Sequence, residues 1–396
     1  MDMHRLNHEQ LVKGVSMGFR RYLFRKIKWD RRMIGILGTK GVGKTTLLLQ
    51  RIKSAFGLSK EALYLSLDAL WFQERCMLSD TVRGFYADGG RHLFLDNVHR
   101  YANWMEEVLT LYRACPDLQI VFAVPTLAGI ERIGQFIGEK GDWYVLHTMS
   151  FREYLSYEGA LEMKPVPLEQ LLLDHKEVTR QVAGEINMES VFRNYLSHGC
   201  YPFYWEDPDA FAFRLQDMVR DMVDADLLPV HPMGNVMVHK MKLLLLQLGR
   251  MAPKVPTRKY LITEYHLDNS QIQKLLRYIE ETEIFRFLSF GEEKARRLRS
   301  IYSFWANPNL MASFAGDMAS LYAGETFFVD QMSNCGTLEL LPTGDYRVND
   351  TYTFMIGGME TPYERIRNLE NTFAAVCGQM ESMDNRIPLW AFGLCY

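Results

Sequence analysis

Cysteine is scarce in this sequence and is not arranged for disulfide or metal chemistry. The 396 residues include six cysteines, and none lies in a CxxC pair or at a spacing from histidine that would hold zinc. The six are Cys76, Cys115, Cys200, Cys335, Cys377 and Cys395. We interpret them as free thiols in a reducing compartment and expect the protein to be cytoplasmic.

Long hydrophobic runs and an excess of one charge are also missing. The longest apolar runs, such as Leu243 to Leu246, are far shorter than the ~20 residues that cross a bilayer, and no signal-peptide pattern opens the sequence. We therefore expect no membrane segment. With 45 basic and 48 acidic residues the formal net charge is −3, so no global field draws the chain to nucleic acid. Any contact with DNA would depend on a local patch.

Apolar side chains are plentiful and regularly spaced in the first part of the chain. Hydrophobic residues make up 48% of the sequence and aromatic residues 13%, enough to bury more than one core. Between Met33 and Met149, short apolar segments alternate with helical ones, which predicts an α/β fold with a parallel sheet covered by helices. The expected strands are Met33–Leu37, Ala62–Ser66, His92–Leu95, Ile120–Val124 and Tyr144–Leu146.

The remaining sequence predicts a helical region followed by mixed structure. Residues 151–248 are almost entirely helical in pattern, which indicates a helical lid or bundle. Asp268 can cap a helix from Gln271 to Glu280, and strand-like residues Ile284 to Phe290 follow, an order that favours a winged helix. Residues 316–396 contain short strands and glycine-rich turns.

A phosphate-binding loop stands between the first strand and the next helix. Its sequence fits G-x-x-x-x-G-K-[ST], where glycine amides and a helix N-terminus face the phosphates. We expect Lys44 to reach the β- and γ-phosphates and Thr45 to ligate Mg²⁺. The expected contacts of the nucleotide, ATP, are Gly38, Thr39, Lys40, Gly41, Val42, Gly43, Lys44, Thr45 and Thr46.

A carboxylate follows the third expected strand. The apolar run from His92 ends in Asp96, which we interpret as the second protein ligand of Mg²⁺, the Walker B residue. The alternative is that Asp96 only caps the next turn. We interpret His92, His99 and His147 as core or surface residues, because none is paired at metal-ligand spacing.

Several separated motifs resemble one family, the prokaryotic AAA-type P-loop ATPases with a winged helix and a C-terminal domain related to PD-(D/E)xK nucleases. The resemblance covers residues 31 to 396 and depends on the order of its motifs. Besides the phosphate-binding loop and the strand that ends at Asp96, these motifs are Val98-His99, Asn103-Trp104, Ser150 to Leu155, Gly199 to Pro202, Asn307 to Leu310 and Asn385 to Gly393.

The chain departs from this family at the positions that drive ATP hydrolysis. The resemblance implies a glutamate after Asp96, but Asn97 stands there, and an amide cannot accept a proton from water. Of the family's γ-phosphate sensor only the hydroxyl of Thr126 is kept, and Lys140 is a weak substitute for the missing arginine. Asp68, after the second strand, either replaces the glutamate or caps a turn.

The C-terminal region departs from the family in its nuclease motif. The resemblance implies a metal-binding carboxylate and a lysine where Met355 and Met359 stand, which leaves Asp350 as the one matching acidic residue. Because thioethers do not hold Mg²⁺, we expect a nuclease-like fold without nuclease activity.

Basic side chains of the expected winged helix could neutralise DNA phosphates across residues 271–299. They are Lys274, Arg277, Lys294, Arg296, Arg297 and Arg299. Glutamates are interleaved with them, so we expect at most weak, salt-dependent DNA binding, and packing between domains is the alternative.

These observations predict an ATP-binding, AAA-type molecular switch in which nucleotide sets the angle between the sheet domain and the lid, with slow or absent hydrolysis. An active ATPase that takes a residue from elsewhere or from a neighbouring subunit, and a DNA-binding regulator with a structural ATP site, are the alternatives. The expected parts are an N-terminal helical extension (1–30), an ATP-binding domain (31–150), a helical lid (151–250), a winged helix (251–315) and an inactive nuclease-like domain (316–396). A protein partner or a homo-oligomer is compatible with all three functions.

Overall fold

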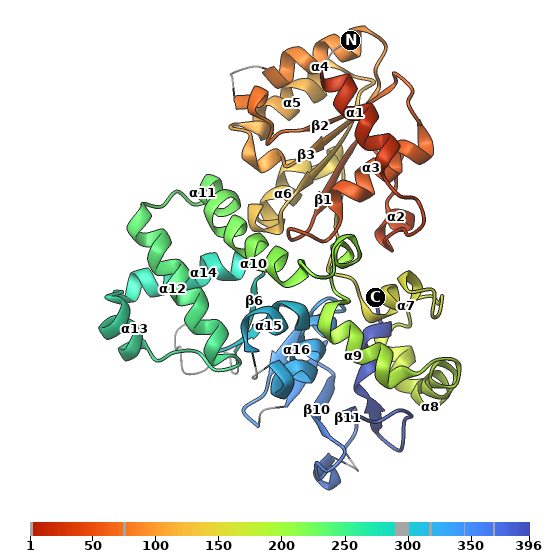
Figure 1. The fold of residues 1–396 in the computed structure, drawn as a ribbon, viewed down its shortest axis with the longest axis vertical. Coiled ribbons are helices and arrows are strands. Elements are labelled where there is room, and N and C mark those ends of the chain that lie inside the picture. Colours follow the sequence, from red (N-terminus) through yellow and green to blue (C-terminus); the bar gives the residue numbers. More distant parts are fainter. Residues whose placement is uncertain (1–2, 74–76, 290–300, 317–318, 344, 367–368) are drawn as a thin grey trace. The chain divides into compact units, whose positions relative to one another are not determined.

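The computed structural model describes residues 3–73, 77–289, 301–316, 319–343, 345–366 and 369–396 (Figure 1). The chain divides into two compact units. The first contains Met1–His147 and Asp221–Met233, and the second contains Thr148–Arg220 and Gly234–Tyr396. A short segment of the helical region, residues 221–233, therefore belongs with the first unit.

The first unit is built on a five-stranded parallel sheet with the order β2-β3-β4-β1-β5. Its strands are β1 Met33–Leu37, β2 Ala62–Ser66, β3 His92–Asp96, β4 Gln119–Val124 and β5 Gly141–Val145. The predicted α/β class is confirmed. The last strand begins at Gly141 and not at Tyr144, because β5 is an edge strand whose exposed Trp143 breaks the apolar pattern.

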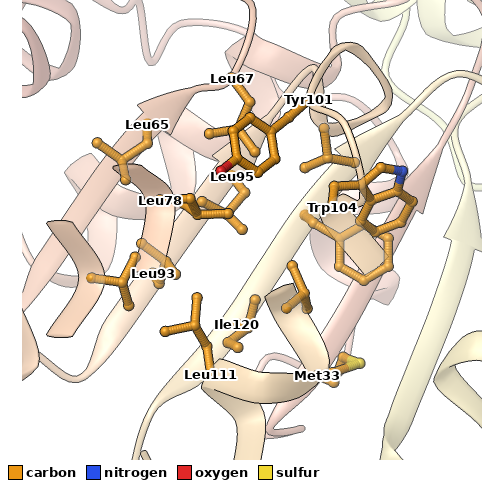
Figure 2. Packing of buried hydrophobic residues seen from close by; sticks show 14 of the residues in the cluster. Met33, Leu65, Leu67, Leu78, Leu93, Leu95, Tyr101, Trp104, Leu111 and Ile120 are labelled. Atoms are coloured by element: carbon orange, nitrogen blue, oxygen red, sulfur yellow. The ribbon is translucent and has the colours of Figure 1, made fainter. Parts of the chain in front are cut away.

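Alternating side chains of the strands build a separate core on each face of this sheet. On one face, Met33 and Leu37 pack among side chains of α4 Met77–Ala87, α5 Trp104–Ala114 and α6 Ile130–Ile137. Figure 2 shows Met33, Leu78 and Leu111 in this core. On the other, Ile34 and Ile36 pack among side chains of α1 Met3–Gly14, α2 Leu23–Lys26 and α3 Lys44–Ala55. Helices therefore cover both faces, as a buried parallel sheet requires.

The N-terminal helix α1 supplies hydrogen-bond partners to the exposed edge of the sheet at β2. The Nδ1 atom of His8, a buried side chain, accepts a hydrogen bond from the backbone N–H of Tyr64 at 2.9 Å. Arg5 donates to the carbonyl oxygens of Ala62 and Ser59. Because an open strand edge exposes unpaired backbone groups, these contacts explain why the N-terminal segment belongs to this unit.

Residues 221–233 form a short helical insertion in the first unit. A π-helix spans Met222–Asp226, and α11 follows at Leu227–Val230. Asp226 is buried at the end of the π-helix. A π-helical turn is uncommon and often marks a functional position, so the surroundings of Asp226 are described with the site below.

The second unit begins with helices, as the sequence predicts for residues 151–248. They are α7 Phe151–Tyr157, α8 Leu168–Glu185, α9 Met188–His198, α10 Phe211–Asp221 and α12 Asn235–Met251. In the parts of the chain that the structure describes, no helix combines the length and the apolar composition that crossing a bilayer needs.

The predicted capped helix follows, and it is confirmed with slightly wider bounds. After α13 Arg258–Tyr265, helix α14 spans Asn269–Glu281. Asp268 accepts from the N–H of Gln271, and the Gln271 side chain accepts from the N–H of Asp268, so each satisfies one free amide at the helix start. Strands β6 Phe285–Ser289 and β7 Ile301–Trp305 then pair antiparallel.

The C-terminal part of the second unit adds two helices and a mixed sheet. The helices are α15 Pro308–Phe314 and α16 Ala319–Ser333. The sheet has the order β12-β11-β10-β9-β8, in which β10, β11 and β12 are parallel and the pairs with β9 are antiparallel. Its strands are β8 Leu338–Leu340, β9 Tyr346–Val348, β10 Tyr352–Gly358, β11 Thr372–Cys377 and β12 Arg386–Pro388.

His8 makes the stability of the first unit depend on pH. Burial and, to a smaller degree, the charge of Arg5 lower the pKa of His8 from 6.5 to about 4. Unfolding therefore takes up a proton between these pH values, and the free energy of unfolding falls as pH drops from 6.5 toward 4. In His8→Asn the amide oxygen can still accept from Tyr64, so we expect this dependence to be lost.

Urea unfolding of wild type and His8→Asn at several pH values between 4 and 7 measures the effect, with the same substitution at exposed His266 as the control for replacing a histidine. The free energy of unfolding should change more steeply with pH in wild type than in His8→Asn. The difference in slope should correspond to the uptake of up to about one proton on unfolding. Parallel pH profiles for the two proteins would show that His8 is not the group responsible.

Candidate phosphate-binding site

The loop between β1 and α3 has the backbone geometry of a phosphate-binding loop. Gly41 and Gly43 adopt positive φ angles of 83° and 98°, which disfavour residues with a side chain. A Cβ on Gly38 would lie 2.4 Å from the carbonyl oxygen of Leu146, so this glycine allows two loops to approach closely. Helix α3 begins directly after the loop at Lys44, and the N-terminus of a helix favours an anion.

The functional side chains of the loop lie beside the end of β3. Thr45 Oγ1 donates a hydrogen bond to Asp96 Oδ2 at 2.5 Å, and Asp96 is buried. Lys44 Nζ donates to the carbonyl oxygens of Gly38 and Thr39, both at 2.7 Å, and so lies within the curve of the loop. The structure thus brings together the predicted lysine, hydroxyl and carboxylate, although β4 separates β1 from β3 in the sheet.

The oxygen atoms of Thr45 and Asp96 fit a magnesium ion that is shared with phosphates. Mg²⁺ prefers hard oxygen ligands and usually keeps several waters, with one or two protein groups. Tyr64 OH donates to the same Asp96 oxygen at 3.0 Å and fixes its position. Burial, followed by the charge of Asp96, raises the pKa of Tyr64, so this hydroxyl remains a neutral donor. Across the described ranges, no three His, Cys, Asp or Glu side chains form a metal-binding group.

Asn97 replaces the expected glutamate and turns toward the neighbouring strand. Its backbone is left-handed, with φ 52°, and its N–H donates to Asp96 Oδ1 at 2.9 Å. Its side-chain amide lies 3.1 Å from Ser66 Oγ and 3.4 Å from Asp68 Oδ2. Ser66 is the last residue of β2, and Asp68 lies in the turn that follows. Ser66 Oγ in turn donates to Asp68 Oδ1 at 2.6 Å. A carboxylate is therefore held beside the amide that cannot act as a base.

Asp226 connects the phosphate-binding loop to the turn after β3. Its Oδ1 atom accepts from Arg100 Nη2 at 2.5 Å, from Arg100 Nε at 3.0 Å and from His99 Nε2 at 3.2 Å. Lys40, in the phosphate-binding loop, lies 3.7 Å from Asp226 Oδ2 and 3.1 Å from Asp221 Oδ2. Lys40 of the phosphate-binding loop and Arg100 of the turn after β3 thus both form ion pairs with residues 221–233.

The ionisation of this cluster follows from its partners. Burial alone would raise the pKa of Asp226, but hydrogen bonds from His99 and Arg100 and the charge of Lys40 hold this pKa well below its usual range. Burial lowers the pKa of His99, against the effect of Asp226. Asp226 is therefore charged and His99 neutral near pH 7, so the charge is balanced by Lys40 and Arg100.

Three other residues that the sequence analysis singled out differ in their position relative to the site. Thr126 is buried directly beyond the end of β4, the strand between β1 and β3, where a sensor is expected. Thr46 is exposed on α3. The proposal of Lys140 as a phosphate cation is wrong: Lys140 precedes β5 and contacts the carbonyl oxygens of Phe136 and Ile137, at the amino ends of the parallel strands.

The residues proposed for DNA or nuclease chemistry are in the second unit. Lys274 and Arg277 are exposed on α14, where both lie over the ring of Tyr278. Asp350 is exposed in the turn between β9 and β10, and Met355 packs against a small hydrophobic cluster. Met359 is exposed after β10. Lys294, Arg296, Arg297 and Arg299 fall outside the described residues.

Sequence reasoning missed four residues that the structure places at the site. Arg100, Asp226 and Tyr64 interact with the cluster as described above. Arg21, in the N-terminal segment, is buried and donates to the carbonyl oxygen of Val42 at 2.5 Å, which supports the loop from outside. Arg100 had a sequence signal, since it follows the expected metal ligand by four residues. The other three had none, because their partners are distant in sequence.

One family model matches the part of the chain that contains the phosphate-binding loop. Residues 30–155 match the family model of an AAA domain, which supports the predicted AAA-type P-loop domain. No curated protein matches the chain.

Among solved structures, the chain is similar to AMPPCP-bound DnaA from Aquifex aeolicus, with 15% identity and a TM-score of 0.27 over 71% of this chain and 86% of that one. It is also similar to a structure of katanin self-assembly, with 12% identity and a TM-score of 0.29 over 82% of this chain and 88% of that one.

Lys44→Ala should abolish Mg-ATP binding and leave the fold intact. The variant loses the charged donor inside the loop, and hydrogen bonds to charged groups are worth about 1.5–3 kcal/mol each. Lys53→Ala is a matched control, because Lys53 lies at the other end of α3 and also donates to two backbone carbonyl oxygens. Calorimetric titration measures the affinity for Mg-ATP, and the melting temperature shows whether the fold is intact. Equal ATP affinity in wild type and Lys44→Ala would contradict the assignment.

Proposed function

We propose that this protein binds ATP with Mg²⁺ and acts as an AAA-type nucleotide-dependent switch with slow hydrolysis. The observation that carries the proposal is the contact between Thr45 and Asp96, which joins the phosphate-binding loop to the end of β3. A hydroxyl and a carboxylate that meet at the N-terminus of a helix, beside a lysine, suit a phosphate-bound Mg²⁺. The AAA domain match of residues 30–155 supports the same proposal.

Slow turnover follows from the groups that surround the site. Rapid hydrolysis needs a group that orients water and a cation on the γ-phosphate. Asn97 provides an amide where a carboxylate is needed. Arg100 is engaged with Asp226, so its charge is shared with a carboxylate. Binding requires neither group, and the residues that bind phosphate and metal are all present.

The switch itself is supported by the contacts of residues 221–233. Lys40 lies in the expected nucleotide-contact segment and pairs with Asp221 and Asp226. Phosphates that attract Lys40 would compete with these carboxylates. Residues 221–233 continue at both ends into the second unit. We therefore propose that this segment transmits nucleotide occupancy to the second unit.

An active ATPase is the second candidate function, because Asp68 and Arg100 lie next to the site with their charges 3.9 Å apart. A subunit of a homo-oligomer could supply a further cation. A winged helix that binds DNA weakly, a nuclease-like domain without activity and a cytoplasmic location remain proposals from the sequence. Exposed Lys274 and Arg277 are the described residues that support DNA contact.

Titration of Mg-ATP by calorimetry, followed by single-turnover hydrolysis on the same sample, tests the proposed function. We expect saturable binding with a low rate of hydrolysis in wild type. Asn97→Glu should raise that rate by roughly tenfold or more, because it places a carboxylate beside Asp96. Rapid wild-type turnover would favour the active ATPase. No gain in Asn97→Glu would mean that the missing γ-phosphate cation limits hydrolysis.

Hydrogen exchange of residues 221–233 tests the proposed route of the signal. Mg-ATP should increase amide exchange in this segment, since phosphates compete with Asp221 and Asp226 for Lys40. Lys40→Met should show the higher exchange without nucleotide and change little when ATP saturates it, with occupancy checked by calorimetry. Unchanged exchange in wild type on ATP binding would contradict this route.

A further inference from the structure

The carboxylate that is missing after Asp96 is present in the turn that follows the neighbouring strand, β2. We propose that Asp68 is a catalytic residue, which orients and deprotonates the water that attacks the γ-phosphate of ATP. This assignment depends on the proposed function, because it requires Mg-ATP at the phosphate-binding loop.

The register of the sheet places Asp68 beside the metal-binding end of β3. Strands β2 and β3 are parallel, and Ser66 lies directly opposite Asp96. The N–H of Leu67 donates to the carbonyl oxygen of Asp96 at 2.9 Å, so the chain after β2 follows the edge of the site. Asp68 therefore leaves the sheet at the same edge as Asp96.

The side chain of Asp68 is held next to the position that a glutamate would occupy. Its Oδ2 atom is 3.4 Å from Asn97 Nδ2, and its Oδ1 atom accepts from Ser66 Oγ at 2.6 Å. The backbone of Asn97 is itself bonded to Asp96, whose other oxygen accepts from Thr45. A short chain of hydrogen bonds thus connects Asp68 to the metal-ligand pair.

The surroundings of Asp68 suit a base that works on water. About a third of its side chain, 36%, is exposed, so a water molecule can reach the carboxylate. Arg100 pairs mainly with Asp226, and its Nη1 atom lies 3.9 Å from Asp68 Oδ2, which keeps Asp68 at the same edge of the sheet. The alternative role, a cap on the turn after β2, needs only the bond to Ser66 and leaves the contact with Asn97 unexplained.

The proposed step balances without a further reactant. The oxygen of water bonds to the γ-phosphorus while the bond between that phosphorus and the β–γ bridging oxygen breaks, and the bridging oxygen leaves with ADP. Asp68 accepts a proton from the water and then releases it to the product phosphate.

Single-turnover hydrolysis with saturating Mg-ATP tests the assignment. Asp68→Asn should lower the rate by about 10²-fold while the dissociation constant for ATP changes by less than about twofold. Asp68→Glu should keep part of the activity. The exposed Asp88 lies after α4, and Asp88→Asn is the matched control, with an expected rate equal to wild type.

A double variant separates catalysis from a structural role. Asp68→Asn combined with Asn97→Glu should recover turnover, because a carboxylate returns beside Asp96 from the adjacent position. Three outcomes would each overturn the assignment and leave the ATP-binding switch in place. They are an unchanged rate in Asp68→Asn, a loss of rate that Asn97→Glu does not restore, and wild-type protein that binds ATP without any turnover. Absence of ATP binding in wild type would instead overturn the proposed function.

Discussion

The parallel direction of the five strands decides where the chemistry of the first unit can occur. Each strand ends at the same edge of the sheet, so the loops after β1, β2, β3 and β4 leave it side by side. Residues that are far apart in sequence, such as Thr45 and Asp96, meet there although a third strand lies between theirs. A buried parallel sheet needs helices on both faces, which leaves this edge as the place where polar loops gather. The site is therefore a consequence of topology before it is a consequence of any single motif.

Buried charge adds a second constraint, which links the site to residues 221–233. A buried carboxylate that loses its partners costs several kcal/mol, so Asp226 is stable in its position only while Arg100, His99 and Lys40 contact it. Any ligand that changes the position of Lys40 changes the free energy of this cluster. Residues 221–233 belong to the first unit but continue into the second at both ends. A change in this segment can therefore be passed to the second unit through the chain itself. This coupling is the physical argument for the switch that we propose.

Local signals explain what the sequence could predict. Strand β1, the start of α3 after the glycine-rich loop and the capped start of α14 are each specified by neighbouring residues, and the structure confirms these elements. The edge strand β5 was harder, because its exposed residues hide the apolar pattern. The pairing of Asp226 with Arg100 spans more than a hundred residues and depends on how the chain returns to the first unit, which no local pattern records.

The motifs of the second unit that carry the family resemblance have a structural role in this protein. Ser150 Oγ and Arg152 Nε both donate to the backbone oxygen of Tyr396, at 2.9 and 2.8 Å. Asn309 accepts from the N–H of Cys200 and donates to the carbonyl oxygen of Tyr195, so two further motifs meet in the same unit. All six residues are buried. Buried polar groups must be paired, and these pairs fix how distant segments pack. The residues of these motifs therefore serve packing in this protein. Their resemblance to the family gives no support to nuclease or DNA-binding chemistry, because that chemistry would need accessible carboxylates or cations.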